Sequence, residues 1–256
     1  MRENNEDSGY AGPSLLLVAD GVGGNAAGEV ASASVSHVIA AFAFQAERHR
    51  NPVTLLEDAI GFAFTHLRQG VTLDPGRSGM ATTLTAVLAH RDGFALAHLG
   101  DSRGYLLRGT MLQQITRDDT FVQELVDAGK ISRDDAASHP YRSVVVKSVT
   151  ADDRPVTSVM PLHLVVGDRL LLCSDGLTDL VPDETVATIL SEGSPTDAAR
   201  RLVDAALEAG GKDNVTCVVG DVCEGDPYIR AGQLVGAQQN PDNLIDPAAA
   251  LAQCTE

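Results

Sequence analysis

The middle of the chain consists of short apolar runs separated by tight turns. Three pairs of runs show this pattern: 82–90 with 94–99, 104–108 with 111–115, and 162–166 with 169–174. Asp92-Gly93 lies in the first turn and Gly109 in the second, and both are typical of β-hairpins. Parallel strands need a crossover of roughly a dozen residues or more, which such turns do not supply. The pattern therefore predicts antiparallel sheet.

Helical patterns flank these hairpins on both sides. Residues 26–49 predict a long helix because Ala, Val, Ile and Phe dominate there. A second helix, 51–69, opens with Asn51 as N-cap and Pro52 at the first helical position. The other expected elements are a strand at 14–19, two short helices within 119–137 with Ser132 as an N-cap, helices at 182–192 and 195–209 with Ser194 as an N-cap, and a strand at 214–222. Hairpins between helix pairs predict an α+β fold.

Composition limits the partners that such a chain can have. The 256 residues include 19 Lys and Arg against 35 Asp and Glu, so the formal net charge is −16. Nucleic acids and anionic membranes attract Lys and Arg, so both are disfavoured as partners. No apolar run approaches the ~18 residues of a membrane span, and the four cysteines contain no C-x-x-C pair. We therefore expect a cytoplasmic monomer with no membrane span in this chain.

Several aspartates stand where an apolar run begins or ends. Asp20, Asp101 and Asp175 directly follow such runs, and Asp213 comes just before the last one. Strand ends are rigid mounts, which suits carboxylates that must be held at fixed positions. Oxygen ligands without nearby His or Cys favour hard cations such as Mg²⁺ and Mn²⁺ over zinc. The alternative is that these aspartates only turn the chain.

Seven short motifs follow one another along the chain, and together they are far more specific than any one alone. They are Arg2–Ser8, Asp20–Glu29, Gly79–Thr83, His98–Arg103, Ser138–Ser143, Cys173–Asp179 and Gly211–Thr216. This ordered set resembles the metal-dependent serine/threonine protein phosphatases of type 2C, the PPM family. It is most similar to bacterial members that act opposite Hanks-type kinases, and it covers residues 2–222.

The resemblance implies a four-layer α-β-β-α sandwich, with helices outside two antiparallel sheets and a two-metal site at one end of the sheets. The metals would be Mn²⁺ or Mg²⁺, and their implied ligands are Glu6, Asp20, Gly21, Asp175 and Asp213. Asp20 would bridge both ions, while Gly21 would bind through its carbonyl and Glu6 through water. Bacterial relatives hold a third metal, for which the corresponding residues are Asp101 and Ser143. Residues 119–142 would form a flap beside the site.

The implied activity is hydrolysis of phosphoserine and phosphothreonine in proteins, by a metal-bridged hydroxide that attacks phosphorus directly. The implied catalytic residues are Arg2, Asp20, Asp175 and Asp213, and the residues expected to support them are Asp7, Asp179 and Asn214. The planar guanidinium of Arg2 would grip the substrate phosphate. Val22 replaces a histidine that many eukaryotic relatives offer as a general acid, so the proton donor to the leaving group is not identified. Phosphorylated proteins, including a Hanks-type kinase, are the expected partners.

Residues 1–223 are expected to form the phosphatase domain and residues 224–256 a tail or extension. After Glu224 the chain is dominated by Gly, Pro, Asn, Asp and Gln, which disfavours a packed core. The family normally has a strand before the arginine that corresponds to Arg2, so the first strand is expected to be missing. One sheet would then expose a bare edge, and Arg2 would be held loosely.

Two other functions stay open at this point. One is a weak or inactive module that keeps the fold and binds phosphoproteins, and the other is a phosphatase that acts on an anti-sigma-factor antagonist. Arg2 taken alone also fits a solvated terminal charge, and Asp179 fits the first acid of the following turn. The glycine-rich stretch 21–28 lacks both G-x-G-x-x-G and a P-loop lysine, which disfavours nucleotide binding.

Overall fold

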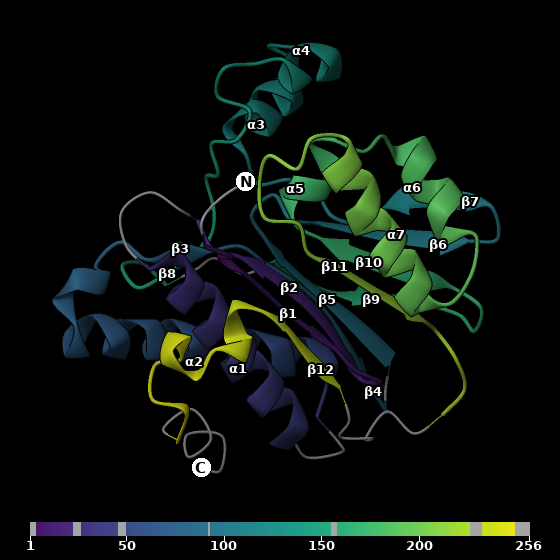
Figure 1. Ribbon diagram of the computed structural model, residues 1–256. Coiled ribbons are helices and arrows are strands. Elements are labelled where there is room, and N and C mark those ends of the chain that lie inside the picture. The colour runs from purple at the N-terminus through teal and green to yellow at the C-terminus, as the bar shows by residue number, and fades with distance from the viewer. Residues whose placement is uncertain are drawn as a thin grey trace.

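Two antiparallel sheets stack face to face, and helices cover the outer face of each sheet (Figure 1). In this computed structural model, residues 4–22, 27–45, 50–91, 93–154, 158–225 and 232–248 are described. Within these ranges, the helices all fall short of the length and apolarity that a bilayer crossing needs. The layers are those of the four-layer α-β-β-α sandwich, and the predicted α+β class is confirmed.

The larger sheet has the strand order β12-β1-β2-β4-β5-β9. Its strands are β1 (Asp7–Ala11), β2 (Leu15–Asp20), β4 (Leu84–His90), β5 (Gly93–Leu99), β9 (Ser158–Leu162) and β12 (Gln233–Gly236). The predicted strand at 14–19 and the predicted hairpin at 82–99 are both present. Asp7 lies directly opposite Asp20 in the ladder between β1 and β2. This register places two carboxylate-bearing residues side by side at one end of the sheet.

The smaller sheet has the strand order β11-β10-β6-β7. Its strands are β6 (Arg103–Arg108), β7 (Met111–Gln114), β10 (Arg169–Cys173) and β11 (Cys217–Asp221). The hairpin predicted at 104–115 is formed by β6 and β7. A separate two-stranded ladder joins β3 (Ala81–Thr82) to β8 (Val149–Thr150).

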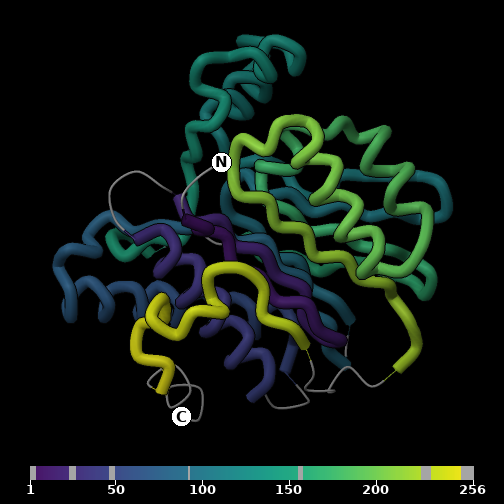
Figure 2. The backbone as a smooth tube through the Cα atoms, in the orientation of Figure 1, coloured from purple at the N-terminus to yellow at the C-terminus, as the bar shows by residue number. Residues whose placement is uncertain are grey.

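The helices fall into three groups. Against the larger sheet lie α1 (Gly28–Gln45) and α2 (Pro52–Leu73); against the smaller sheet lie α5 (Asp175–Thr178), α6 (Asp183–Leu190) and α7 (Pro195–Glu208). The short helices α3 (Phe121–Asp127) and α4 (Arg133–Ala137) project away from both sheets (Figure 2). Single 3-10 turns are η1 (Pro75–Arg77), η2 (Ala237–Gln239) and η3 (Pro241–Asn243). The projecting pair is the flap expected within 119–142.

Helix starts follow the capping residues that the sequence predicts. Asn51 accepts a hydrogen bond from a backbone N–H in the first turn of α2, at 2.8 Å, and Ser194 does the same for α7 at 3.2 Å. Ser132 forms a reciprocal capping box at the start of α4. Helix α2 runs four residues beyond the predicted end at Gln69, whereas the predicted ends of the first helix, at 26 and 46–49, lie outside the described residues.

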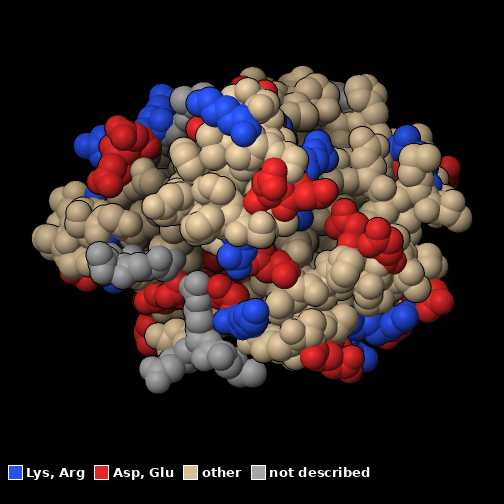
Figure 3. All heavy atoms as spheres, turned by 90° about the horizontal axis from the view of Figure 1, so that it is seen from above, with Lys and Arg blue, Asp and Glu red and all other residues tan. Residues whose placement is uncertain are grey.

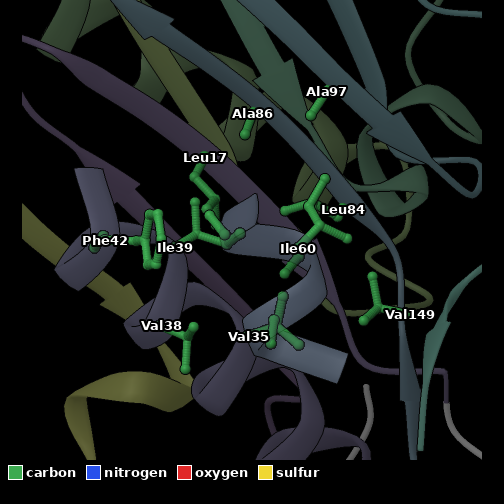
Figure 4. Packing of buried hydrophobic residues seen from close by; sticks show 14 of the residues in the cluster. Leu17, Val35, Val38, Ile39, Phe42, Ile60, Leu84, Ala86, Ala97 and Val149 are labelled. Atoms are coloured by element: carbon green, nitrogen blue, oxygen red, sulfur yellow. The ribbon is translucent and has the colours of Figure 1, made fainter. Parts of the chain in front are cut away.

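Three hydrophobic cores lie between the four layers. The largest joins α1 and α2 to the larger sheet, with Leu17, Ile39 and Ile60 fully buried (Figure 4). A second core fills the space between the sheets, and a third lies under α6 and α7. Leu17 and Val18 are neighbours in β2 but belong to different cores, because successive side chains of a strand point to opposite faces. Burial on both faces makes β2 a rigid support for the Asp20 that ends it.

The hairpin predicted at 162–174 is wrong. β9 pairs with β5 in the larger sheet, whereas β10 pairs with β6 and β11 in the smaller one. Between them the Asp168 carboxylate accepts hydrogen bonds from the Val165 N–H and from the Arg108 side chain. These polar contacts hold the end of the apolar run 162–166 in a turn. The hydrophobic pattern of the sequence does not reveal such contacts.

Part of the expected tail packs on the sandwich. β12 pairs with β1, so that edge of the larger sheet is covered, while β11 is an edge strand of the smaller sheet. Neither β1 nor β12 was predicted from the sequence. The domain boundary at 223, like the missing first strand, stays a prediction.

Candidate active site

A pocket of about 310 Å³ opens at the end of the sandwich that carries the flap. It lies where β2 ends, where β5 turns into β6, where α5 begins, and beside the turn before β11. The predicted site residues that line it are Asp20, Gly21, Asp101, Ser143, Asp175, Asp179 and Asp213. The fold therefore brings together acids that are far apart in the sequence, as the motif order predicts.

The carboxylates in this pocket raise one another's pKa values. Burial raises the pKa of Asp20 well above its usual range, and neighbouring carboxylates raise it further. Burial also raises the pKa of Asp101 to about 7, with Asp175 adding to the effect. The pKa of Asp175 is raised to about 6, by burial first and then by Asp179 and Asp213. A bound divalent cation would lower these pKa values and favour the ionised carboxylates.

Asp20 is held by two threonines of the β3–β4 segment. The Asp20 N–H donates to Thr83 Oγ1 at 2.9 Å, and the Asp20 carbonyl accepts from the Thr82 hydroxyl and the Thr83 N–H, both at 2.8 Å. Thr82 and Thr83 are almost fully buried. Because both the N–H and the carbonyl of Asp20 are hydrogen-bonded, its Cα is held at a fixed position beside the pocket.

The next residue, Gly21, accepts no side chain. A Cβ built there would lie 2.5 Å from the Gly28 carbonyl and 2.8 Å from the Glu6 carbonyl oxygen. The Gly21 N–H donates to that same Glu6 carbonyl at 3.1 Å. The close packing of these backbones therefore requires glycine at position 21, beside the pocket.

Asp175 and Asp213 are brought together by a close packing of two backbones. Asp175 is the first residue of α5, and a Cβ on the following Gly176 would lie only 2.0 Å from the Asn214 carbonyl oxygen. The Asn214 N–H donates to Asp213 Oδ1 at 2.7 Å. Only glycine allows the start of α5 to lie this close to the turn that carries Asp213.

Asn214 also holds the segment that leads into β1. Its Oδ1 accepts a hydrogen bond from the Glu6 N–H at 2.9 Å, and its Nδ2 donates to the Asn4 carbonyl at 3.2 Å. The sequence predicts a supporting role for Asn214, and these two bonds are consistent with it. They tie the acidic start of β1 to the turn that carries Asp213.

Asp7 is a fully buried carboxylate beside this site. Its Oδ2 accepts a hydrogen bond from Ser174 Oγ at 2.8 Å, whereas Oδ1 has no hydrogen-bond partner. Burial raises the pKa of Asp7, and Asp213 raises it further. A buried carboxylate oxygen without a donor, opposite Asp20 in the ladder, is an unsatisfied group that a bound cation or its water would satisfy.

Two cations at the pocket were not assigned a role from the sequence. Arg142 and Lys212 both line it, and Arg142 Nη2 lies 3.4 Å from Asp179 Oδ2. Both occur inside motifs that the sequence singles out, next to Ser143 and Asp213, and that adjacency is the signal for them. A second groove of about 580 Å³ continues from the pocket beneath the flap.

Three further residues that the sequence singled out are Arg2, Val22 and Glu6. Arg2 lies outside the described residues, so its role as a phosphate ligand stays a prediction. Val22 lines the pocket and is 38% exposed, so the position that holds histidine in many eukaryotic relatives presents an aliphatic side chain here. Glu6 directly precedes β1. Its N–H donates to Asn214 Oδ1 and its carbonyl accepts from the Gly21 N–H, so its backbone is fixed beside the pocket.

The donor set fits divalent hard cations. Every predicted ligand is an oxygen atom of a carboxylate, a carbonyl or a hydroxyl, which suits Mg²⁺ and Mn²⁺. In the described part of the chain, no three acidic, His or Cys side chains already stand as a closed metal cage. The aspartates line an open pocket. On the face seen in Figure 3, acidic and basic side chains are interspersed, with the basic ones in small separate groups.

A sandwich of two antiparallel sheets, with carboxylates gathered in a pocket at one end, is consistent with a metal-dependent phosphohydrolase. The model of the protein phosphatase 2C family matches residues 4–209. The chain belongs to the protein phosphatase 2C family.

Named relatives agree with this assignment. The chain is 46% identical over 247 residues to the serine/threonine protein phosphatase PstP of Mycobacterium tuberculosis, covering 96% of this chain and 47% of PstP. It is 31% identical over 229 residues to the serine/threonine phosphatase Stp of Listeria welshimeri, covering 86% and 90% of the two chains. The chain thus spans about half the length of the mycobacterial relative.

A solved structure gives the same picture of the fold. The catalytic domain of the serine/threonine protein phosphatase PstP, solved in complex with two manganese ions, superimposes with a TM-score of 0.76 at 44% identity. The match covers 88% of this chain and 94% of that domain. The family, the fold and the similarity to bacterial members that the motifs imply are confirmed.

Proposed function

We propose that this chain removes phosphate from phosphoserine and phosphothreonine in proteins, in a hydrolysis that depends on Mn²⁺ or Mg²⁺. The observation that carries the proposal is the meeting of Asp20, Asp101 and Asp175 in one pocket, each with a raised pKa. Carboxylates that repel one another in this way are suited to holding divalent cations. The names of the two relatives above, both serine/threonine phosphatases, support the same reaction.

The residues proposed to hold two cations are Glu6, Asp20, Gly21, Asp175 and Asp213, and those proposed for a third are Asp101 and Ser143. When bound, paired divalent cations lower the pKa of a shared water and neutralise charge on the phosphoryl group. The threonines that fix the Asp20 backbone, and the close packing at Gly176, would keep these ligands in place.

Positive side chains would hold the phosphate. We assign the main contact to Arg2, because a guanidinium can bind two phosphate oxygens at once. Arg142 and Lys212 supply further positive charge at the pocket wall. Val22 offers no proton, so the leaving alkoxide must receive its proton from another group.

The test is a rate measurement on the full chain. We expect hydrolysis of p-nitrophenyl phosphate and of a phosphothreonine peptide with Mn²⁺, and a loss of about a hundredfold or more with EDTA or with Asp175→Ala. Asp204→Ala, an exposed aspartate on α7, is the matched control and should keep the wild-type rate. Activity that survives EDTA or Asp175→Ala would contradict the proposal.

The same experiment separates the two alternative functions. A chain that binds Mn²⁺ and a phosphopeptide without turnover would be a phosphoprotein-binding module. Turnover confined to a phosphorylated anti-sigma-factor antagonist, with none on the phosphothreonine peptide, would indicate the other phosphatase type. The named relatives favour the general protein phosphatase over both.

The setting of the enzyme is also part of the proposal. We propose a monomer in the bacterial cytoplasm that opposes serine/threonine kinases in signalling, with a Hanks-type kinase among its substrates. Three free thiols, at Cys173, Cys217 and Cys223, are typical of a reducing compartment. Size-exclusion chromatography and dephosphorylation of a phosphorylated kinase domain would test the oligomeric state and the substrate.

A further inference from the structure

The segment 232–246, which we call the C-terminal strap, lies along the edge of the larger sheet and across α1 (Figures 1 and 2). It contains β12, η2 and η3. β12 pairs with β1 over four residues, from Ser8 opposite Gly236 to Ala11 opposite Gln233. With this pairing β1 has a neighbour on each side, β12 and β2, so it is an interior strand of the sheet.

The strap touches β1 beyond the ladder itself. Gly236 has a φ of 73°, and a Cβ built on it would lie 2.1 Å from the Asp7 carbonyl oxygen. The Gln238 side chain is 3% exposed and donates a hydrogen bond from Nε2 to the Gly9 carbonyl. The strap therefore contacts the backbone of β1 at two residues, Asp7 and Gly9, on either side of Ser8.

The far end of the strap is anchored in the helical layer. Ile245 is 2% exposed and fits a notch at Gly70, where an added Cβ would lie 2.4 Å from Ile245 Cδ1. The Ile245 N–H donates to Ser34 Oγ on α1 at 3.1 Å. The Asn243 side chain donates to the Ala237 carbonyl at 2.9 Å, which folds the strap on itself. The strap that contacts β1 is thus also anchored at its other end, by the buried Ile245 side chain packed against Gly70.

β1 leads directly to the metal-site carboxylates. Asp7 faces Asp20 across the ladder, and its side chain accepts the hydrogen bond from Ser174, the residue before Asp175. Gly236 therefore packs against the carbonyl of Asp7, the residue that lies opposite the proposed bridging ligand Asp20.

We propose that the C-terminal strap is a positioning element of the metal site: by gripping β1 at Asp7 and Gly9, it sets Asp7 against Asp20 and so determines how tightly the pocket holds divalent cations. The inference rests on the proposed function for the identity of the metal site. It extends the catalytic unit beyond residue 223, the boundary expected from composition.

The test compares two Gly→Ala variants of the full chain. Gly236→Ala places a methyl group against the Asp7 carbonyl at a positive φ, whereas Gly109→Ala has a similar φ of 61° with nothing within 4 Å of the added atom. Mn²⁺ affinity is measured by calorimetry and the folded state by circular dichroism and thermal unfolding. We expect Gly236→Ala to weaken Mn²⁺ binding about tenfold or more, as loss of groups that orient ligands does. Gly109→Ala should bind Mn²⁺ like wild type.

A second pair of variants keeps the proposal testable if Gly236→Ala does not fold. Gln238→Met keeps the volume but removes the hydrogen bond to Gly9, and Ile245→Val loosens the anchor by one methyl group. Both should weaken Mn²⁺ binding while leaving the circular dichroism spectrum unchanged. If the strap variants lower the melting temperature but bind Mn²⁺ within about twofold of wild type, the strap is only structural and the proposal is overturned.

The metal readout also separates this proposal from the proposed function. A wild-type chain that binds Mn²⁺ without hydrolysing phosphopeptides would overturn the proposed activity, while the strap variants would still test the strap. Weakened Mn²⁺ binding in those variants would support positioning even then.

Discussion

Asp101 and Asp175 are two side chains whose protonation states depend on each other. Burial is the main cause that raises their pKa values, to about 7 and about 6, and each group has neighbouring carboxylates that add to the effect. Near neutral pH and without bound cations, these groups retain protons that the unfolded chain would release. A bound cation would displace these protons, because it favours the ionised carboxylates.

One prediction concerns how the stability of the metal-free chain depends on pH. The folded pKa of Asp101, about 7, lies well above the ordinary aspartate value of 3.8. Its protonated form therefore stabilises the fold fully below about pH 4, and this contribution is lost as pH rises through 7. In EDTA, wild type should lose roughly 4 kcal/mol of unfolding free energy over this range relative to Asp101→Asn, since each pKa unit corresponds to about 1.4 kcal/mol. Urea unfolding across the pH range measures this, and parallel curves for the two proteins would contradict it.

A second prediction concerns Asn214, which ties Asn4 and Glu6 to the Asp213 turn. Asn214→Ala should lower kcat/KM for a phosphothreonine peptide by about tenfold to a hundredfold, because the acidic start of β1 loses its tie. Asn51→Ala, which removes the N-cap of α2 far from the pocket, should cost about 1 kcal/mol of stability and leave kcat/KM unchanged. Equal effects of the two variants on kcat/KM would show that Asn214 acts only through stability.

At the scale of elements, local signals predict helices and hairpins well. The caps at Asn51, Ser132 and Ser194 and the hairpin turn at Gly109 are all present, because their causes lie within a few residues. β9, β12 and β1 were misplaced or missed. β9 pairs with β5 and β12 with β1, so these strands depend on partners far away in the sequence, and their short runs carry no clear alternating pattern.

A third prediction concerns a single side chain that joins three elements. Arg169 at the start of β10 donates two hydrogen bonds to Asp221 on β11, and others to the carbonyls of Leu190, the last residue of α6, and of Gly193. Arg169→Ala should lower the unfolding free energy by about 1–2 kcal/mol, because the part-buried Leu190 carbonyl loses its donor and the ion pair with the half-exposed Asp221 is lost. Arg169→Lys should restore less than half of that, since one ammonium group cannot reach all of these acceptors.

Activity at low temperature provides the control for that prediction. Arg169 lies at the opposite end of β10 from Asp175, so both Arg169 variants should keep Mn²⁺-dependent turnover when they are folded. A large loss of turnover in fully folded Arg169→Ala would mean that this end of the smaller sheet is coupled to the pocket.

At the scale of the whole molecule, the net charge of −16 has two parts. A few acids meet in one pocket, and other acids of the described residues lie outside it, for example on α7. The motif order was sufficient to predict the acids in the pocket, because each is fixed by its own strand end or turn. Arg142 and Lys212 could not be assigned from the sequence, since their place at the pocket depends on how the flap and the β11 turn fold back on the sheets.

The central proposal is that Asp20, Asp175 and Asp213 would together hold two divalent cations. Anomalous diffraction at the manganese edge, from crystals of the full chain grown with Mn²⁺, tests it most directly. We predict two peaks in the pocket on either side of the Asp20 carboxylate, with at least one peak lost in crystals of Asp175→Asn. A pocket without peaks, or manganese bound only away from Asp20, would contradict the account.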